Sequence, residues 1–214
     1  MQESQFLANI RGALSQYSTL EEARVLAENK TPTLGPSPPL EEKILRFIQE
    51  VGELHKVQIL QARDWTEARE KLTQVLTKRE IRSIALAGKD LEPRNPIWSQ
   101  WSQAKDLASV EKAQAGIIQA DFGLAETGSV VLLATPEKPR IASLLPPVCY
   151  FVLPVSAILD SMGRLMEELR SLHGKGNMPS VVNVVTGPSR TADIELSLTV
   201  GVHGPGEVNV VLVG

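Results

Sequence analysis

The sequence predicts an α/β fold of three layers, in which helices cover both faces of a mainly parallel, partly mixed sheet. Several segments are short continuous apolar runs, which is typical of strands that are buried on both faces. Stretches with helical periodicity separate many of these runs, as in sheets whose parallel strands are joined by crossovers. Two regions, 121–135 and 193–213, look like hairpins and would add antiparallel pairs.

The composition limits the classes of function. The chain has 214 residues and a net charge of −3, and no basic run alternates with aromatics, so nucleic-acid binding is disfavoured. Cys149, as the single cysteine, cannot hold an iron–sulfur cluster or a zinc site of several thiolates, and the three histidines lie far apart. No metal or cofactor is therefore expected in this chain. Without a signal pattern or an apolar run of about 18 residues, we expect a cytoplasmic protein that does not enter the membrane.

Three segments are expected along the chain. Residues 1–30 would form a helical arm, with an amphipathic helix over 4–16. Residues 31–39 contain four prolines and a glycine, which predicts a linker, and 40–214 would form the α/β domain. The arm either docks on a neighbouring subunit or another partner, which would allow a homo-oligomer, or lies on its own domain.

The domain opens with two helices and two strands. A clear apolar stripe predicts a helix over 40–54, and a short strand over 57–60 follows. Residues 64–79 form the next helix, with Asp64 as its N-cap, before a strand over 81–88.

The second half of the domain contains most of the strands. Residues 116–135 are predicted as strand, turn and strand, and 193–200 favour a strand without excluding a helix. The remaining elements are strands over 149–155, 181–187 and 207–213, and a helix over 156–172.

The loop over 186–195 is the richest in polar groups. Ligands of such sheets lie in loops beyond the carboxyl ends of strands. Gly187 permits a sharp turn with exposed N–H groups, and the hydroxyls of Ser189 and Thr191 suit a phosphate or a carboxylate. Arg190 adds bidentate recognition of a planar anion, so these four residues are the predicted ligand-binding group.

Two carboxylates follow in the same segment. Asp193 and Glu195 are two positions apart and would project to one face of a strand, where one could hold the other protonated. We therefore predict a catalytic role for Asp193 and a ligand-binding role for Glu195. The alternative is a capped turn followed by a half-exposed strand.

Three other loops supply further candidates. Glu126, in 120–128 with Asp121 and Thr127, could act as a general base or hold a substrate hydroxyl, or could lie in a solvated turn. His203 lies between glycines and could shuttle protons or bond its own backbone. Arg140 is the strong anion ligand of 136–148, unless it is simply solvated.

Some signatures are missing or have simpler explanations. The chain has no phosphate-binding P-loop, no GxGxxG fingerprint and no GxSxG nucleophile elbow. Cys149 lies in an apolar strand and is predicted to be core. Trp98 and Trp101 are predicted to be packing anchors, with a partner surface as the alternative.

These motifs resemble a known family. The stretches ADFGLAETGSVVLLA, ASLLPPV and VVTGPSRTADIELSLTVGVHGPGEVNVVLV, with FLANIRGAL near the N-terminus, resemble the lactate-utilization protein C family (LUD domain, LutC/YkgG type). The resemblance implies a NagB/RpiA/CoA-transferase-like fold. It also implies a part in bacterial oxidation of L-lactate to pyruvate, beside partner proteins that carry the iron–sulfur clusters.

The leading hypothesis is a component of a lactate-utilization system that binds a small carboxylate or a phosphate-bearing ligand. One alternative is a non-catalytic assembly subunit of the same complex. Another is a stand-alone enzyme of the sugar-phosphate isomerase or CoA-transferase kind, which would rest on fold analogy alone.

Overall fold

The computed structural model describes residues 34–55, 57–135, 138, 140–192 and 198–214. The chain divides into two compact units, 1–36 and 37–214. The predicted arm and residues 31–33 of the predicted linker lie outside the described residues, so the division into arm, linker and domain stays a prediction. Residues 34–39 have no regular secondary structure.

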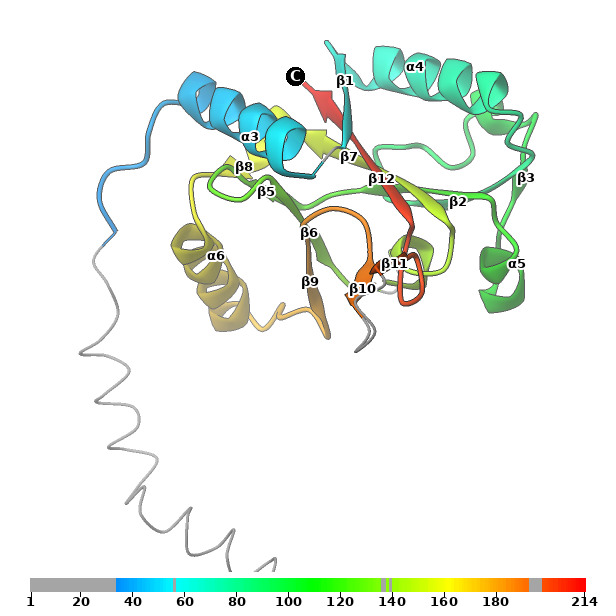
Figure 1. The fold of residues 1–214 in the computed structure, drawn as a ribbon. Coiled ribbons are helices and arrows are strands. Elements are labelled where there is room, and N and C mark those ends of the chain that lie inside the picture. The colour runs from blue at the N-terminus through cyan, green and yellow to red at the C-terminus, as the bar shows by residue number, and fades with distance from the viewer. Residues whose placement is uncertain (1–33, 56, 136–137, 139, 193–197) are drawn as a thin grey trace, which may run out of the picture. The chain divides into compact units, whose positions relative to one another are not determined.

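A six-stranded parallel sheet forms the centre of the larger unit (Figure 1). All five of its strand pairs are parallel. In spatial order the strands are β1 (Gln58–Ala62), β12 (Glu207–Val213), β7 (Val148–Pro154), β4 (Ala115–Gln119), β2 (Ser83–Ala87) and β3 (Ser102–Gln103).

Both faces of this sheet are buried, which explains the continuous apolar runs. Along β7, Tyr150 belongs to the core on one face and Phe151 to the core on the other. Ile117 and Ile118 of β4 divide in the same way, because successive side chains of a strand point to opposite faces. The predicted α/β class with a mainly parallel sheet is confirmed.

One face is covered by helix α4 (Trp65–Lys78) and the 3₁₀ turn η1 (Pro96–Trp98). Asp64 caps α4 as predicted, since its carboxylate accepts a hydrogen bond of 2.8 Å from the Glu67 N–H. Helix α3 (Leu40–His55) packs on the other face, as does the short helix α5 (Leu107–Glu111) through Val110.

The antiparallel pairs lie in separate, smaller sheets. Strands β8 (Ile158–Leu159), β5 (Phe122–Leu124), β6 (Ser129–Leu133) and β9 (Val182–Val185) form a four-stranded mixed sheet in that order. Helix α6 (Met162–Gly174) packs against it through Leu165 and Leu169. Strands β10 (Arg190–Ala192) and β11 (Leu198–Val200) form an antiparallel pair.

Three predictions differ from what is observed. The hairpin expected over 193–213 is wrong, because β11 pairs with β10 and β12 pairs in parallel with β1 and β7. The helix expected over 156–172 begins at Met162, where Ser161 supplies the N-cap; Val155–Ala157 is the 3₁₀ turn η3. Ile158 and Leu159 form β8 instead, because they pair with Gly123 and Leu124 of β5. Of the segment 193–200, residues 198–200 are strand, and 193–197 lie outside the described residues.

The two tryptophans and the cysteine are core residues. Trp98 is fully buried, and its indole N–H donates to the Leu91 carbonyl at 3.0 Å. Trp101 packs beside it, with ring centroids 6.2 Å apart, and donates to the Ile81 carbonyl. Burial raises the pKa of the Cys149 thiol to about 12, which fits an inert core residue.

Candidate functional site

The loops that contain GPSR and GVHGPG meet at the amino end of β12. The Ser189 N–H donates to the Pro205 carbonyl at 2.9 Å, and the Gly201 N–H donates to the Ser189 carbonyl at 2.9 Å. A Cβ on Gly204 would lie 3.3 Å from Ser189 Cβ, so glycine lets the two loops approach this closely. Gly187 turns the chain into the first loop with a φ of 96°.

A chain of three hydroxyls joins the AETGS turn to the same region. Ser129 Oγ lies 2.7 Å from Thr127 Oγ1 and 2.7 Å from Thr186 Oγ1. The cause is the antiparallel register of β6 and β9, which pairs Val130 with Val185 and leaves Ser129 and Thr186 opposite one another. Three of the four predicted loops are therefore neighbours.

A cavity of about 550 Å³ lies between α4 and the two loops that contain GPSR and GVHGPG, which we call the motif loops. Each motif loop contributes one residue to the lining, Pro188 from the first and Gly206 from the second. The other lining residues come from α4 and its C-cap, and from β1 and the first residues of β12: Val75, Lys78, Arg79, Gln58, Glu207, Val208 and Asn209.

Two of the lining residues, Arg79 and Glu207, form an ion pair. The Arg79 guanidinium donates to both carboxylate oxygens of Glu207, at 2.5 and 2.6 Å, and to the Tyr150 hydroxyl at 2.9 Å. These hydrogen bonds raise the pKa of Arg79 and lower that of Glu207, while burial raises the pKa of Tyr150. The wall therefore combines a fixed cation with a fixed anion.

Acid should weaken this pair. The pKa of Glu207 in the folded protein lies below its ordinary value of 4.5, so the pair stabilises the fold above that pH and is lost as the pH falls. Denaturant titrations at several pH values should show a steeper loss of stability on acidification in the wild type than in Glu207→Gln. Glu168→Gln, an exposed glutamate on α6, should keep the wild-type slope. Equal slopes for the wild type and Glu207→Gln would contradict this.

The predicted anion-binding residues lie at the start of β10. Arg190 is its first residue and is exposed. Thr191 is the next residue, and its backbone pairs with Thr199 of β11. His203 is exposed on the turn 201–206, the turn that bonds to Ser189. Asp193 and Glu195 lie outside the described residues.

The comparisons with known proteins point to one family. The LUD domain model matches residues 23–213. The chain belongs to the LUD domain family. A crystal structure of a DUF162 family protein from Deinococcus radiodurans has a TM-score of 0.59 at 16% identity, covering 83% of this chain and 99% of that one. At this identity the likeness supports the fold of the LUD domain alone.

Several curated relatives share part of the sequence of this LUD domain. YkgG of Escherichia coli (strain K12) is 43% identical over 110 residues, which cover 51% of this chain and 48% of that protein. Proteins named Lactate utilization protein C are 39% identical over 113 residues in Shouchella clausii (strain KSM-K16), covering 53% and 49%, and 38% identical over 122 residues in Bacillus subtilis (strain 168), covering 55% and 50%. The chain spans about half the length of the curated relatives it matches.

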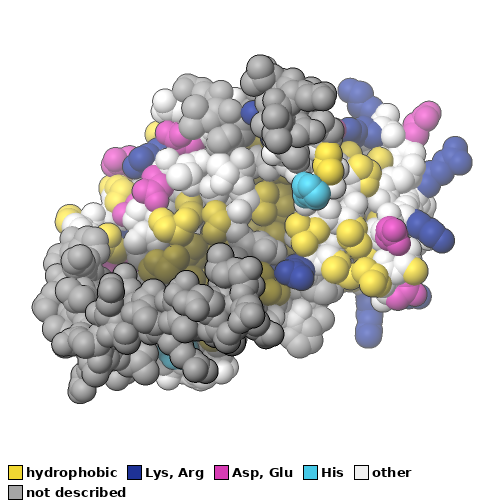
Figure 2. All heavy atoms as spheres, turned by 60° about the horizontal axis from the view of Figure 1, so that its bottom comes forward, with side chains coloured by type: hydrophobic (Ala, Val, Ile, Leu, Met, Phe, Trp, Pro, Cys, Tyr) yellow, Lys and Arg dark blue, Asp and Glu magenta, His cyan; other side chains and the backbone are white. Residues whose placement is uncertain are grey.

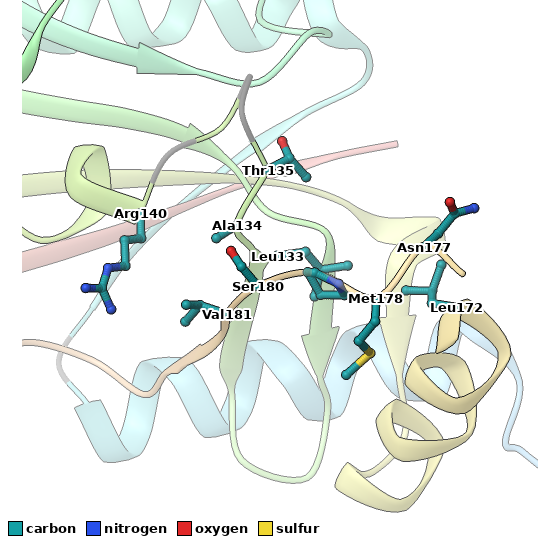
Figure 3. A pocket seen from close by; sticks show the side chains of 10 residues that line it. Leu133, Ala134, Thr135, Arg140, Leu172, Asn177, Met178, Ser180 and Val181 are labelled. Carbon is teal, nitrogen blue, oxygen red and sulfur yellow. The ribbon is translucent and has the colours of Figure 1, made fainter. Parts of the chain in front are cut away.

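Two predicted site residues of the LUD domain lie elsewhere. Glu126 Oε1 accepts a hydrogen bond of 2.5 Å from the Met162 N–H, so this carboxylate faces the N-terminus of α6, where a negative charge is favourable. Arg140 begins the 3₁₀ turn η2 (Arg140–Ser143). Its side chain lines a hollow of about 910 Å³ at the end of β6, where Leu133 is also in the lining (Figure 3). Leu133 ends β6 and Ser129 begins it, so Arg140 lies at the opposite end of that strand from the hydroxyl chain.

The hollow beside Arg140 is mainly apolar. Leu133, Leu172, Met178 and Val181 line it, from β6, α6 and the segment before β9 (Figure 3). Figure 2 shows hydrophobic side chains gathered on the face of the molecule that lies at the bottom of Figure 1. Apart from Arg140, no predicted site residue in the described part of the chain lines this hollow.

Sequence reasoning missed Arg79 and Tyr150. Arg79 caps the C-terminus of α4 and reaches Glu207 across 128 positions of sequence. A basic residue at a helix end gives no hint of such a partner, although Glu207 belongs to the GVHGPGE motif. Among the described residues, no group of three His, Cys, Asp or Glu side chains could hold a metal ion. No described helix combines the length and apolar character needed to cross a membrane.

Proposed function

We propose that this LUD domain is a component of a bacterial L-lactate utilization system, in which lactate is oxidised to pyruvate. The relatives named Lactate utilization protein C support this role. We further propose that it binds a small carboxylate or a phosphate-bearing ligand where its motif loops meet. The observation that carries the ligand site is the pair of hydrogen bonds from the Ser189 and Gly201 N–H groups, which join the two motif loops.

The residues have separate roles in this proposal. Arg190 binds the anion bidentately, and the hydroxyls of Ser189 and Thr191 and the turn at Gly187 complete its surroundings. His203 stands on the adjoining turn and is exposed, and we assign it proton transfer with a substrate hydroxyl. Asp193 continues the same segment as a proposed proton-handling residue, and Glu195 as a proposed ligand-binding residue.

Lactate oxidation needs an electron acceptor, because forming pyruvate releases two electrons and two protons. A chain with one cysteine cannot hold an iron–sulfur cluster by thiolates. We therefore propose that iron–sulfur clusters on partner proteins accept the electrons. In this proposal the chain itself binds and orients the anion. His203 or Asp193 accepts or donates the protons.

A thermal-shift experiment tests the ligand site. L-lactate, pyruvate and inorganic phosphate are each added to the purified full chain, and at least one should raise the melting temperature. Arg190→Ala should abolish this rise and leave the melting temperature without ligand unchanged, because Arg190 is exposed. Arg170→Ala, which removes an exposed arginine of α6, should keep the full rise. An undiminished rise in Arg190→Ala would refute the site.

A role as a non-catalytic assembly subunit makes a different prediction. If residues 1–30 recruit the partner proteins, deleting residues 1–35 should prevent their co-purification with a tagged chain from the native host. Arg190→Ala should leave co-purification intact. Growth of that host on L-lactate as the carbon source should fail with Arg190→Ala if ligand binding is required, and should persist if assembly alone matters.

A further inference from the structure

A third cavity, of about 310 Å³, lies at the opposite end of the parallel sheet from the motif loops. Glu207 begins β12 beside the motif loops, whereas this third cavity opens where β2 and β4 end. Its lining comes from the residues after β2, the end of β4 and the segment after β6: Gly88, Lys89, Gln119, Asp121, Thr135 and Lys138.

The topology of the sheet creates an opening at this point. From β2 the chain runs outward to the edge strand β3, then returns to β4 on the other side of β2. The connection after β2 contributes Trp98 to the core on one face, whereas the connection after β4 contributes Val130 to the core on the other face. Loops that leave in opposite directions open a crevice at the carboxyl ends of adjacent strands, where α/β proteins bind ligands.

A half-buried ion pair lies in this crevice. The Lys138 ammonium donates to Asp121 Oδ2, and the two side chains are 11% and 26% exposed. The Leu133 N–H donates to the same Oδ2 at 2.6 Å. Within the described part of the chain, both hydrogen bonds to the Asp121 carboxylate use Oδ2, which leaves Oδ1 to accept from a ligand hydroxyl. Lysine has three donors, and its bond to Asp121 uses one of them.

Hydrogen bonds between the end of β4 and the segment after β2 hold one wall of the cavity in place. Gln119 accepts from the Asp90 N–H at 3.1 Å and donates to Asp90 Oδ2 at 2.7 Å. Gly88 has a φ of 130°, and a Cβ there would lie 2.3 Å from Gln119 Cβ. A side chain at position 88 would thus collide with Gln119 at the lining of the cavity, and glycine leaves this space free.

We infer that this cavity is a second ligand site, which binds a polyhydroxylated anion. The negative end of the ligand pairs with Lys138 and with Lys89 at the rim, and its hydroxyls bond to Asp121 and Thr135. The cavity volume equals about ten water molecules, which is more than a three-carbon acid fills. The inference is independent of the proposed function, which assigns no role to any residue that lines this cavity; Asp121 belongs to the loop 120–128 but takes no part in the proposed anion site.

Isothermal titration calorimetry on the full chain tests the site with three probes. D-gluconate has both a carboxylate and hydroxyls, sorbitol has hydroxyls without the charge, and hexanoate has the charge without hydroxyls. We expect gluconate to bind saturably and the other two at least about tenfold more weakly, since each lacks one set of partners. Absence of saturable gluconate binding, or equal affinity for all three, overturns the inference.

Variants assign the binding to this cavity. Lys138→Gln should weaken gluconate binding by at least about tenfold, and Lys175→Gln, an exposed lysine at the end of α6, should not change it. Lys89→Gln should weaken it several-fold; because Lys89 is exposed, this variant tests the site even if Lys138→Gln does not fold. Arg190→Ala should leave gluconate affinity unchanged. Unchanged affinity in both lysine variants, or its loss in Arg190→Ala, overturns the assignment.

Discussion

Replacing Trp98 with alanine is expected to lower the free energy of unfolding by about 3–5 kcal/mol. Trp98 is fully buried in the core on the α4 side of the parallel sheet, together with Leu72, Ile117 and Tyr150. Its removal leaves a cavity that the rigid sheet cannot close, and it leaves the Leu91 carbonyl without the indole N–H. Chemical denaturation followed by circular dichroism measures the change.

Two controls separate the causes of this loss. Trp98→Phe keeps most of the ring volume and loses the hydrogen bond, so we expect a smaller destabilisation than with alanine. Leu107→Ala removes an exposed leucine from α5 and should change the free energy of unfolding by less than about 0.5 kcal/mol. If Trp98→Ala were as mild as Leu107→Ala, our account of this core would be wrong.

Replacing Gly128 with alanine should cost about 2–4 kcal/mol of stability. Gly128 has a φ of 63°, and a Cβ there would lie 2.7 Å from the backbone nitrogen of Val51 in α3. The left-handed backbone strain at position 128 and the collision of the added Cβ with α3 both lower the stability. The backbone of α3 cannot move aside as a flexible side chain would. The thermal midpoint and the free energy of unfolding should both fall.

Gly174→Ala is the matched control for this substitution. Gly174 ends α6, and a Cβ there would meet nothing within 4 Å, so alanine should leave stability unchanged or raise it slightly. Gly128→Ala should also weaken binding at the motif loops, because the turn holds Thr127 and Ser129 in the hydroxyl chain to Thr186. A variant at 128 with wild-type stability would show that this turn does not need glycine.

Much of the fold could be predicted from local patterns. Asp64 and the apolar stripe after it define α4, and the apolar run 207–213 is β12 as observed. Periodicity failed at Ile158 and Leu159, whose apolar character suits a helix as well as a strand. Their partners in β5 are more than thirty positions earlier, and only that pairing decides between the two.

The candidate loops were found in part from the sequence. Composition singled out the loops around Ser189 and His203 and the AETG turn, and the structure brings these three together, with Ser129 and Thr186 in hydrogen-bonding contact. The same reasoning could not place Glu126, whose partner is a backbone N–H at the start of another helix. The sequence did not indicate Lys138 as a candidate site residue either. Its proposed role depends on the ion pair with Asp121 and on the strand order, which local sequence does not encode.

The position of β12 bears on how the chain folds during synthesis. β12 lies between β1 and β7, and β1 has no other partner in the six-stranded sheet (Figure 1). Gln58 pairs with Asn209, about 150 positions later, so β1 leaves the ribosome long before its partner exists. Until residues 207–213 emerge, β1 and the facing side of β7 expose unpaired backbone. We expect the nascent chain to fold slowly and to need protection from aggregation over this interval.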